Sequence, residues 1–228
     1  MKFRFVTITN KGYYHYTQNC MESLKVSPNA PQLECYFTDK LGYDQYKTDS
    51  NVHYIGDKSS ENESDQIRFR KGNWISLVGK KINVISKILK TGDCVIITDG
   101  DIVYKHPQWF DYIKERMSNP EVEFMCMNDM LSDDDHRMLC SGFMVLKPTV
   151  NNMKYFNEDI DITDHKCDQL YVNNIKNDLK YEVLPLDKFP NGRLHQAATD
   201  PYVLHYNFMI GNTKQQKMKK SGNWLIKS

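Results

Sequence analysis

Two aspartates separated by one glycine follow a hydrophobic run in the middle of the chain. The run, residues 94–98, lies between Gly92 and the tripeptide Asp99-Gly100-Asp101. Its apolar residues show no alternation, a pattern typical of a parallel strand that is buried on both faces. Because the carboxyl ends of strands face the ligand crevice in open α/β sheets, we expect both carboxylates to project into a binding site. A pair of acids at such a position binds a hard cation, transfers protons, or does both.

A histidine and several lysines near the other end of the chain extend this chemistry. His205 lies in the strand-like run 202–206, and beyond Asp200 the chain has no acid but five lysines, at 214, 217, 219, 220 and 227. Taken singly, such a histidine and a short basic tail have ordinary structural explanations, a packed imidazole and a solvated face. Two carboxylates and one imidazole together suit Mn²⁺ or Mg²⁺ with positions left open for substrate oxygens. Lysines that neutralise phosphate make a nucleoside diphosphate the natural ligand.

Alternating strands and helices must position these residues. Hydrophobic periodicity and breaker residues predict strands at 3–9, 33–38, 52–55, 94–98, 122–127, 143–146, 181–184 and 202–206. The same signals predict helices at about 17–26, 74–91, 109–117 and 163–175, the last with Thr163 as its N-cap. Residues 56–66 are expected to form a polar loop. This order predicts an α/β fold in one domain, since 228 residues suffice for a single large core.

One cation interrupts the apolar stripe of the predicted helix 74–91. Lys81, Ile85 and Ile88 follow one another at spacings of four and three residues on one helix face. Lys81 therefore either extends its ammonium group to the edge of the packed face, which is the commoner arrangement, or points into a polar site beside the sheet. A run of three aspartates at 133–135 also has two interpretations, a metal site or a solvated loop, and the loop is the more frequent.

Composition and charge argue against several classes of partner. Lysine and arginine number 30 against 29 aspartates and glutamates, so the net charge of +1 gives no electrostatic basis for binding nucleic acid or a membrane surface. No stretch approaches the roughly 20 apolar residues that span a bilayer, and residues 1–6 lack the basic and apolar regions of a signal peptide. The six cysteines show no paired spacing. We therefore expect reduced thiols and a cytoplasmic protein without a membrane anchor.

At several points, in the same order along the chain, the sequence resembles the GT-A fold glycosyltransferases. Asp99-Gly100-Asp101 after a hydrophobic strand looks like their DXD motif. A first strand that ends at Thr7 and Thr9 and is followed by Tyr13 is similar to the nucleoside-binding opening, and Lys81 is similar to a basic residue near the diphosphate. Cys140-Ser141-Gly142 is similar to the Asn-Ala-Gly or Asn-Ser-Gly turn beside the donor sugar, with cysteine in place of asparagine, and Asp168-Gln169 is similar to an Asp-Gln element on the sugar's other side. His205, Gly211 and Lys214 are similar to a C-terminal His, Gly and Lys motif.

This resemblance implies a fold and a set of roles. The fold would be a single GT-A domain over residues 1–228, a Rossmann-like mixed central sheet flanked by helices, with a nucleotide-binding half at about 1–104 and a sugar- and acceptor-binding half at about 105–228. The implied roles are metal binding by Asp99, Asp101 and His205, with Mn²⁺ or Mg²⁺ as cofactor; nucleotide binding by Thr7, Thr9, Tyr13, Lys81, Asp99, Gly100, Gly211 and Lys214; sugar binding by Ser141, Gly142 and Asp168; and catalysis by Gln169 with Asp168.

The implied activity is transfer of a sugar from a nucleotide-diphosphate sugar, UDP rather than GDP, to a hydroxyl of a glycan, glycolipid or protein. The overall match is to retaining enzymes related to the glycogenin and lipopolysaccharide galactosyltransferase group, although the His-to-Gly spacing is nearer to plant cell-wall α-glycosyltransferases. Retention of configuration is therefore expected. The metal, Lys81 and Lys214 would stabilise the leaving diphosphate, and Gln169 would face the oxocarbenium-like sugar.

Two other functions fit part of the pattern. Residues 95–103 also satisfy the first motif of haloacid-dehalogenase-type phosphatases, in which Asp99 would be the nucleophile and Asp101 the general acid/base. That motif normally lies on the first strand of its domain, whereas at least two strand-helix units are predicted before Asp99. The other alternative is a non-catalytic sugar-nucleotide-binding module, which would bind UDP and Mn²⁺ without turning over any donor.

Overall fold

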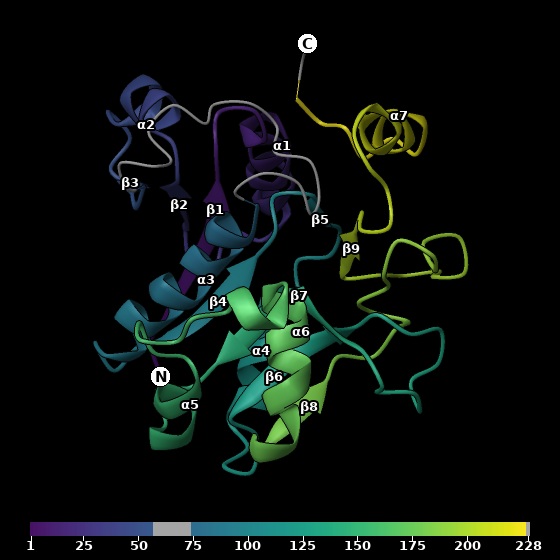
Figure 1. The fold of residues 1–228 in the computed structure, drawn as a ribbon. Helices are drawn as coiled ribbons and strands as arrows, with labels where there is room; N and C mark the ends of the chain where they lie inside the picture. The colour runs from purple at the N-terminus through teal and green to yellow at the C-terminus, as the bar shows by residue number, and fades with distance from the viewer. Residues whose placement is uncertain (57–73, 227–228) are drawn as a thin grey trace.

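The computed structural model describes residues 1–56 and 74–226, and its centre is a seven-stranded mixed sheet (Figure 1). The strand order is β3-β2-β1-β4-β7-β6-β8. β1 is parallel to β2 and β4, and β2 to β3, whereas β7 is antiparallel to β4 and β6, and β8 is parallel to β6. The strands are β1 (Phe3–Thr9), β2 (Leu33–Phe37), β3 (Val52–Tyr54), β4 (Cys94–Thr98), β6 (Phe124–Asn128), β7 (Leu139–Leu146) and β8 (Tyr181–Val183).

Apolar side chains on the two faces of this sheet form two separate cores. Successive residues of one strand point to opposite faces, so Ile96 of β4 belongs to one cluster and Val95 and Ile97 to the other. The first cluster is covered by α1 (Tyr14–Ser23), α2 (Lys40–Tyr46) and α4 (Trp109–Met117), and the second by α3 (Trp74–Leu89), α5 (Val150–Tyr155) and α6 (Asp168–Ile175). Single 3₁₀ turns occur at η1 (Leu24–Val26), η2 (Thr163–His165) and η3 (Lys176–Asp178). The result is a three-layer α/β domain, which confirms the predicted fold class.

A small second sheet carries the late part of the chain back to the end of β4. β5 (Ile102–Tyr104) follows the acidic tripeptide directly and pairs antiparallel with β9 (Val203–His205), and Ile102 lies opposite His205. The helix α7 (Asn212–Lys220) follows β9. This pairing places His205 beside the residue that precedes Ile102, which is Asp101.

An irregularity in β7 places a second segment at the same point. Along β6, Cys126 pairs with Met144 but the next residue, Met127, pairs with Cys140, so residues 141–143 have no counterpart on β6. Such bulges re-aim side chains and occur near active sites. Phe143 still pairs with Thr98 of β4. The bulged Ser141-Gly142 segment therefore lies beside the carboxyl end of β4.

The predicted elements agree with the structure except at their ends and in the short ones. The prediction missed β5, α2, α5 and α7. It also started the late helix at Thr163, which was wrong, because the chain forms a 3₁₀ turn there and α6 begins only after Cys167, whose Sγ accepts the Leu170 N–H at 3.4 Å. From residue 57 on, the predicted loop lies outside the described residues.

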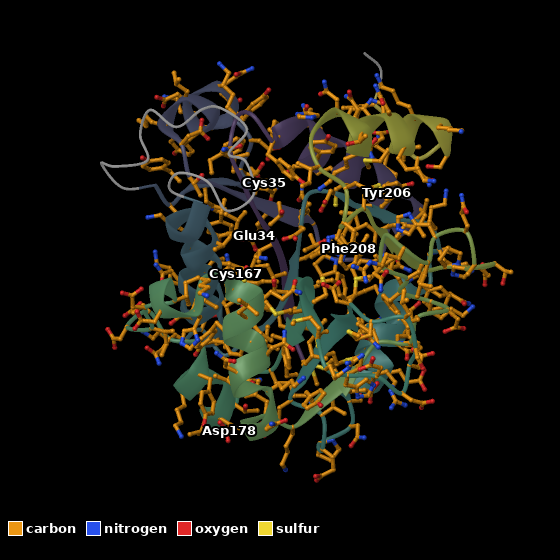
Figure 2. All side chains as sticks on the ribbon, turned by 45° about the vertical axis from the view of Figure 1, so that its right-hand side comes forward. Glu34, Cys35, Cys167, Asp178, Tyr206 and Phe208 are labelled. Atoms are coloured by element: carbon orange, nitrogen blue, oxygen red, sulfur yellow. The ribbon has the colours of Figure 1, made fainter. Side chains whose placement is uncertain are left out.

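The cysteines and the surface agree with the composition. All six cysteines are free and buried, and Figure 2 marks two of them, Cys35 and Cys167. In the part of the chain that the structure describes, no helix combines the length and the apolar character needed to cross a membrane. The aspartates at 133 and 134 are exposed in a loop, which agrees with the solvated-loop interpretation of the run 133–135.

Candidate functional site

The two aspartates leave β4 at a point where protein surrounds the backbone closely. The Asp99 N–H donates to the Gly142 carbonyl oxygen at 2.7 Å, and the Tyr206 N–H donates to the Asp101 carbonyl oxygen at 3.1 Å. A side chain at Gly100 would lie 2.6 Å from Thr17 Oγ1, so the tripeptide needs glycine to pass the start of α1. The tripeptide is therefore held between α1, β7 and the residue that follows β9.

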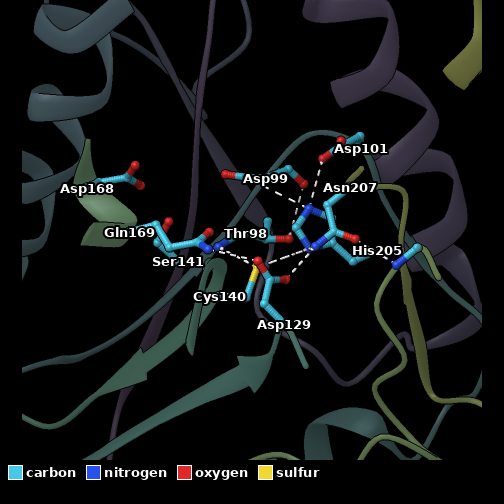
Figure 3. Close-up of polar contacts among 12 residues, drawn as sticks. Thr98, Asp99, Asp101, Asp129, Cys140, Ser141, Asp168, Gln169, His205 and Asn207 are labelled. Atoms are coloured by element: carbon cyan, nitrogen blue, oxygen red, sulfur yellow. Dashed lines mark hydrogen bonds and ion pairs between the residues drawn. The ribbon is translucent and has the colours of Figure 1, made fainter. Parts of the chain in front are cut away.

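Asp99, Asp101 and His205 form a cluster with metal-ligand chemistry (Figure 3). One ligand atom from each residue lies within 4.8 Å of the other two. His205 Nε2 is 3.4 Å from Asp101 Oδ1 and 3.8 Å from Asp99 Oδ2. Asp101 Oδ1 is buried and accepts no hydrogen bond in the described structure, an expensive state for a carboxylate oxygen unless a cation compensates it. Two carboxylate oxygens and one imidazole nitrogen with an unsatisfied buried oxygen fit a divalent cation.

Lys214 from α7 neutralises the other oxygen of Asp101. Its Nζ forms a short ion pair with Asp101 Oδ2 and donates to the Tyr13 hydroxyl at 2.8 Å. Burial alone would raise the pKa of Asp101, but Lys214 and His205 outweigh it and lower that pKa. Burial alone would lower the pKa of His205, yet Asp101 reverses this and raises it. Asp101 thus keeps one oxygen for Lys214 and one facing His205.

Lys81 points into the site. The expectation that its ammonium group lies at the edge of the packed face was therefore wrong. Lys81 is 6% exposed, and its Nζ lies 2.7 Å from Asp168 Oδ2, 3.0 Å from Asp99 Oδ1 and 3.1 Å from the Ser141 carbonyl oxygen. Burial alone would lower the pKa of Lys81, but the carboxylates of Asp168 and Asp99 raise it. A buried cation therefore links the end of β4 to the start of α6.

Asp129 holds Gln169, and Asn207 in turn holds Asp129, although neither residue was selected from the sequence. Asp129 is buried, and its Oδ2 accepts from Gln169 Nε2 at 2.8 Å while its Oδ1 accepts from Asn207 Nδ2 at 2.7 Å (Figure 3). Asn207 lies two residues after His205, and Asp129 directly follows β6. The position of Asp129 at the end of a buried strand was the available signal, the same one that selected Asp99.

Cys140, which stands where the resembled motif has asparagine, contacts the proposed metal ligand. Its Sγ is 3.5 Å from His205 Nδ1. The ring nitrogen that faces the carboxylates is Nε2, so the thiol contacts the other ring nitrogen, on the side away from the carboxylates. Burial raises the pKa of this thiol well above its ordinary value. Cys140 is therefore a neutral packing partner of His205.

The structure brings most of the predicted site residues together but leaves three at its border. Tyr13, Lys81, Asp99, Asp101, Ser141, Asp168, His205 and Lys214 are joined by the contacts given above. Thr7 and Thr9 are buried within β1, and Thr9 Oγ1 accepts a hydrogen bond from Thr17 at 3.0 Å. Gly211 is the N-cap residue of α7 with φ of 58°, and its carbonyl accepts from the Tyr16 hydroxyl at 3.2 Å.

Replacing Gly142 by alanine tests whether the site tolerates any side chain at the bulge. The new Cβ would lie 2.2 Å from His205 Cε1 and 2.9 Å from Asp99 Oδ2, so the imidazole must move. We expect Mn²⁺-dependent binding of UDP to weaken roughly 10- to 100-fold, the range for disturbed metal sites, as measured by calorimetric titration.

Gly79→Ala in α3 is the matched control for this variant, because its Cβ would meet Ile162 at an ordinary 3.5 Å. The control should bind UDP and Mn²⁺ as the unchanged protein does. Binding by Gly142→Ala that equals binding by this control would contradict the assigned position of His205.

The chain is similar to known sugar-nucleotide transferases over most of its length. The model of the nucleotide-diphospho-sugar transferase family matches residues 39–220. A curated relative, the UDP-galactose:fucoside alpha-3-galactosyltransferase of Dictyostelium discoideum, is 25% identical over 186 residues, which are 66% of this chain and 28% of that protein. The chain therefore spans little more than a quarter of the length of this relative.

Solved structures share the fold at low sequence identity. The bifunctional glycosyltransferase WbbM has a TM-score of 0.58 at 14% identity, over 91% of this chain and 46% of its own. Mouse xyloside xylosyltransferase 1 has a TM-score of 0.55 at 12% identity, over 92% of this chain and 100% of its own. GlyE of Streptococcus pneumoniae has a TM-score of 0.57 at 14% identity, over 99% of this chain and 62% of its own. These similarities establish the GT-A architecture.

Proposed function

Because the chain belongs to the nucleotide-diphospho-sugar transferase family, we propose that it is a metal-dependent glycosyltransferase that moves a sugar from a UDP-sugar to an acceptor hydroxyl with retention of configuration. The observation that carries this proposal is the cluster of Asp99, Asp101 and His205 between two buried lysines, Lys81 and Lys214. Acids that hold a cation and lysines that neutralise phosphate are the two requirements of a diphosphate site. The relative from Dictyostelium, whose name specifies UDP-galactose, supports UDP as the nucleotide.

The chain's own residues have defined tasks in binding the donor. Asp99, Asp101 and His205 would hold Mn²⁺ or Mg²⁺, which when bound supplies positive charge to the diphosphate oxygens. Tyr13 and Lys214 contact each other at 2.8 Å beside Asp101, at the place proposed for the diphosphate. Thr7, Thr9, Gly100 and Gly211 are proposed to shape the nucleotide site mainly through backbone, since the two threonines are buried and the other two are glycines.

The proposed sugar site lies on the opposite side of Asp99. Ser141, Gly142 and Asp168 are joined there through Lys81 and Asp99, and Gln169 follows Asp168. In transfer, the bond between the anomeric carbon and the phosphate oxygen breaks with its electron pair on the diphosphate, and the acceptor oxygen bonds to the anomeric carbon from the same face. The acceptor's proton goes to the leaving phosphate oxygen. The Gln169 carbonyl dipole stabilises the positive charge that develops on the sugar.

The two alternatives predicted from sequence are weaker. Asp99 follows the fourth strand in chain order, whereas the nucleophile of the phosphatase motif follows the first strand of its domain. A binding module that lacks turnover would share the metal and lysine cluster, but the match to a family of transferases favours an enzyme.

A panel of UDP- and GDP-sugars tests the proposal. A ligand that binds only the native state raises thermal stability, so we expect a shift with at least one UDP-sugar in the presence of Mn²⁺ and a smaller one with EDTA. Released UDP should then be detected with the same sugar. Stabilisation without any released UDP, with or without a mixed glycan acceptor pool, would favour the binding module, whereas hydrolysis of simple phosphate esters that Asp99→Asn abolishes would favour the phosphatase.

His205→Ala separates a metal ligand from a packed imidazole. His205 is 2% exposed and presents Nε2 to both aspartates, so its loss should remove one ligand while leaving the lysines in place. We expect UDP affinity to fall roughly 10- to 100-fold with Mn²⁺ present and to stay within about twofold in EDTA. An equal loss under both conditions, measured by calorimetry, would mean that His205 supports the fold and does not bind metal.

A further inference from the structure

Phe208 combines an exposed aromatic ring with a strained backbone. The residue is 47% exposed and has φ of 60°. Among the described residues, the only other non-glycine residue with positive φ is Lys166. A bulky residue in the left-handed region is strained, and such positions concentrate at functional sites. Lys166 lies two residues before Asp168 and Phe208 three residues after His205, so both strained residues border the candidate site.

The loop that carries Phe208 is fixed by a second loop, residues 190–195. The Gly192 N–H donates to Asn207 Oδ1 at 2.6 Å, and a side chain at Gly192 would lie 2.2 Å from the Asn207 carbonyl oxygen. His195 Nε2 lies 2.8 Å from the His205 carbonyl oxygen and donates to it. The residue before Phe208 is thus bonded both to this loop and, through Asp129, to Gln169. The backbone that carries Phe208 is therefore fixed relative to Gln169.

A cation stacks on one face of the Phe208 ring and leaves about half of the residue exposed. The Arg193 guanidinium carbon lies 3.9 Å from the centroid of the Phe208 ring. Phe208 remains 47% exposed with Arg193 in place, and Ile210, two residues further along the chain, is 66% exposed. Figure 2 shows Phe208 below α7. An ordered, open apolar surface at the rim of a site indicates a ligand that packs on it.

We infer that Phe208 is a stacking platform for the acceptor, and that the acceptor is therefore a saccharide. A pyranose has a face of C–H groups, whose hydrogens carry partial positive charge and pack on the negative face of an aromatic ring. A hydroxyl on a polypeptide side chain or a lipid headgroup needs no flat surface of this kind. The inference rests on the proposed function, and it narrows the acceptor from glycan, glycolipid or protein to a sugar ring stacked on Phe208.

The test is binding of the full chain, with UDP and Mn²⁺ present, to a printed array of mono- to tetrasaccharides. We expect the unchanged protein to bind a subset of these saccharides. Phe208→Ala should lower affinity for that subset roughly tenfold or more. Its affinity for UDP and Mn²⁺ should stay unchanged, and its melting temperature should stay unchanged or rise. Phe208→Trp should keep the binding. Val150→Ala, at an 83% exposed position on α5, is the control for loss of an exposed apolar side chain.

The outcomes separate this inference from the proposed function. Absence of saccharide binding by a protein that binds UDP and Mn²⁺, or equal binding by Phe208→Ala and Val150→Ala, would overturn the stacking platform and leave the transferase proposal intact. Failure to bind UDP with Mn²⁺ would overturn both.

Discussion

Asp101→Asn is expected to abolish Mn²⁺-dependent binding of UDP and to destabilise the fold at the same time. Asp101 is 3% exposed, and its two oxygens serve different partners, Lys214 at Oδ2 and the side of His205 at Oδ1. The substitution removes a metal ligand and leaves the Lys214 ammonium buried without its counter-charge. Breaking a buried pair in this way costs about 3 kcal/mol or more, which lowers the melting temperature of a chain of this size by roughly 6–12 °C.

A second variant separates the two effects. Asp101→Asn combined with Lys214→Met removes the stranded cation, so most of the lost melting temperature should return, whereas UDP binding with Mn²⁺ should remain undetectable by calorimetry. Recovery of the melting temperature in the double variant would assign the destabilisation to the stranded Lys214 ammonium group. If the single variant still bound UDP in a Mn²⁺-dependent manner, Asp101 would not be a metal ligand.

The fold was predictable where the sequence pattern is long and regular. β1 and α4 have the predicted bounds, and β4 and α3 differ by at most two residues at one end, because uninterrupted apolar runs and a stripe at helical spacing leave few alternatives. The missed elements are short or rely on tertiary contacts. β5 has three residues and exists only through its pairing with β9, and α7 has four lysines within nine residues and little apolar periodicity.

The candidate site, like the fold, could be predicted only in part. Asp99 and Asp101 could be selected from their place after a buried strand, whereas the position of the Lys81 ammonium depends on Asp168, which is 87 residues away in the sequence. Asp129 carried the same signal as Asp99, a position directly after a buried strand, whereas Asn207 carried none, because it reaches Asp129 only through the return of β9 to the end of β4. The bulge in β7 that brings Gly142 next to His205 likewise depends on strand pairing, so it could not be predicted from composition.

Asp129→Asn is expected to lower turnover while leaving UDP binding intact. Both oxygens of Asp129 accept from amide nitrogens, Gln169 Nε2 at 2.8 Å and Asn207 Nδ2 at 2.7 Å. A carboxylate only accepts, so Gln169 must turn its NH₂ group toward Asp129 and its carbonyl oxygen away from it, which we propose is toward the sugar. Asparagine at 129 has one acceptor instead of two, and its own NH₂ group favours the reversed Gln169 amide. We expect kcat for release of UDP from the donor found in the panel to fall roughly 100-fold, the effect of losing one oriented dipole.

A compensating variant distinguishes this effect from loss of structure. In Asp129→Asn with Gln169→Glu, the asparagine NH₂ group again has an acceptor facing it, so kcat should recover at least in part relative to Asp129→Asn, whereas Gln169→Glu alone places two carboxylates against each other and should be as impaired as Asp129→Asn. Asp134→Asn, which removes the same charge from an exposed loop position, should leave kcat unchanged. A kcat for Asp129→Asn within about threefold of that control would contradict the positioning of Gln169 by Asp129, because a reversed amide dipole cannot stabilise a developing positive charge.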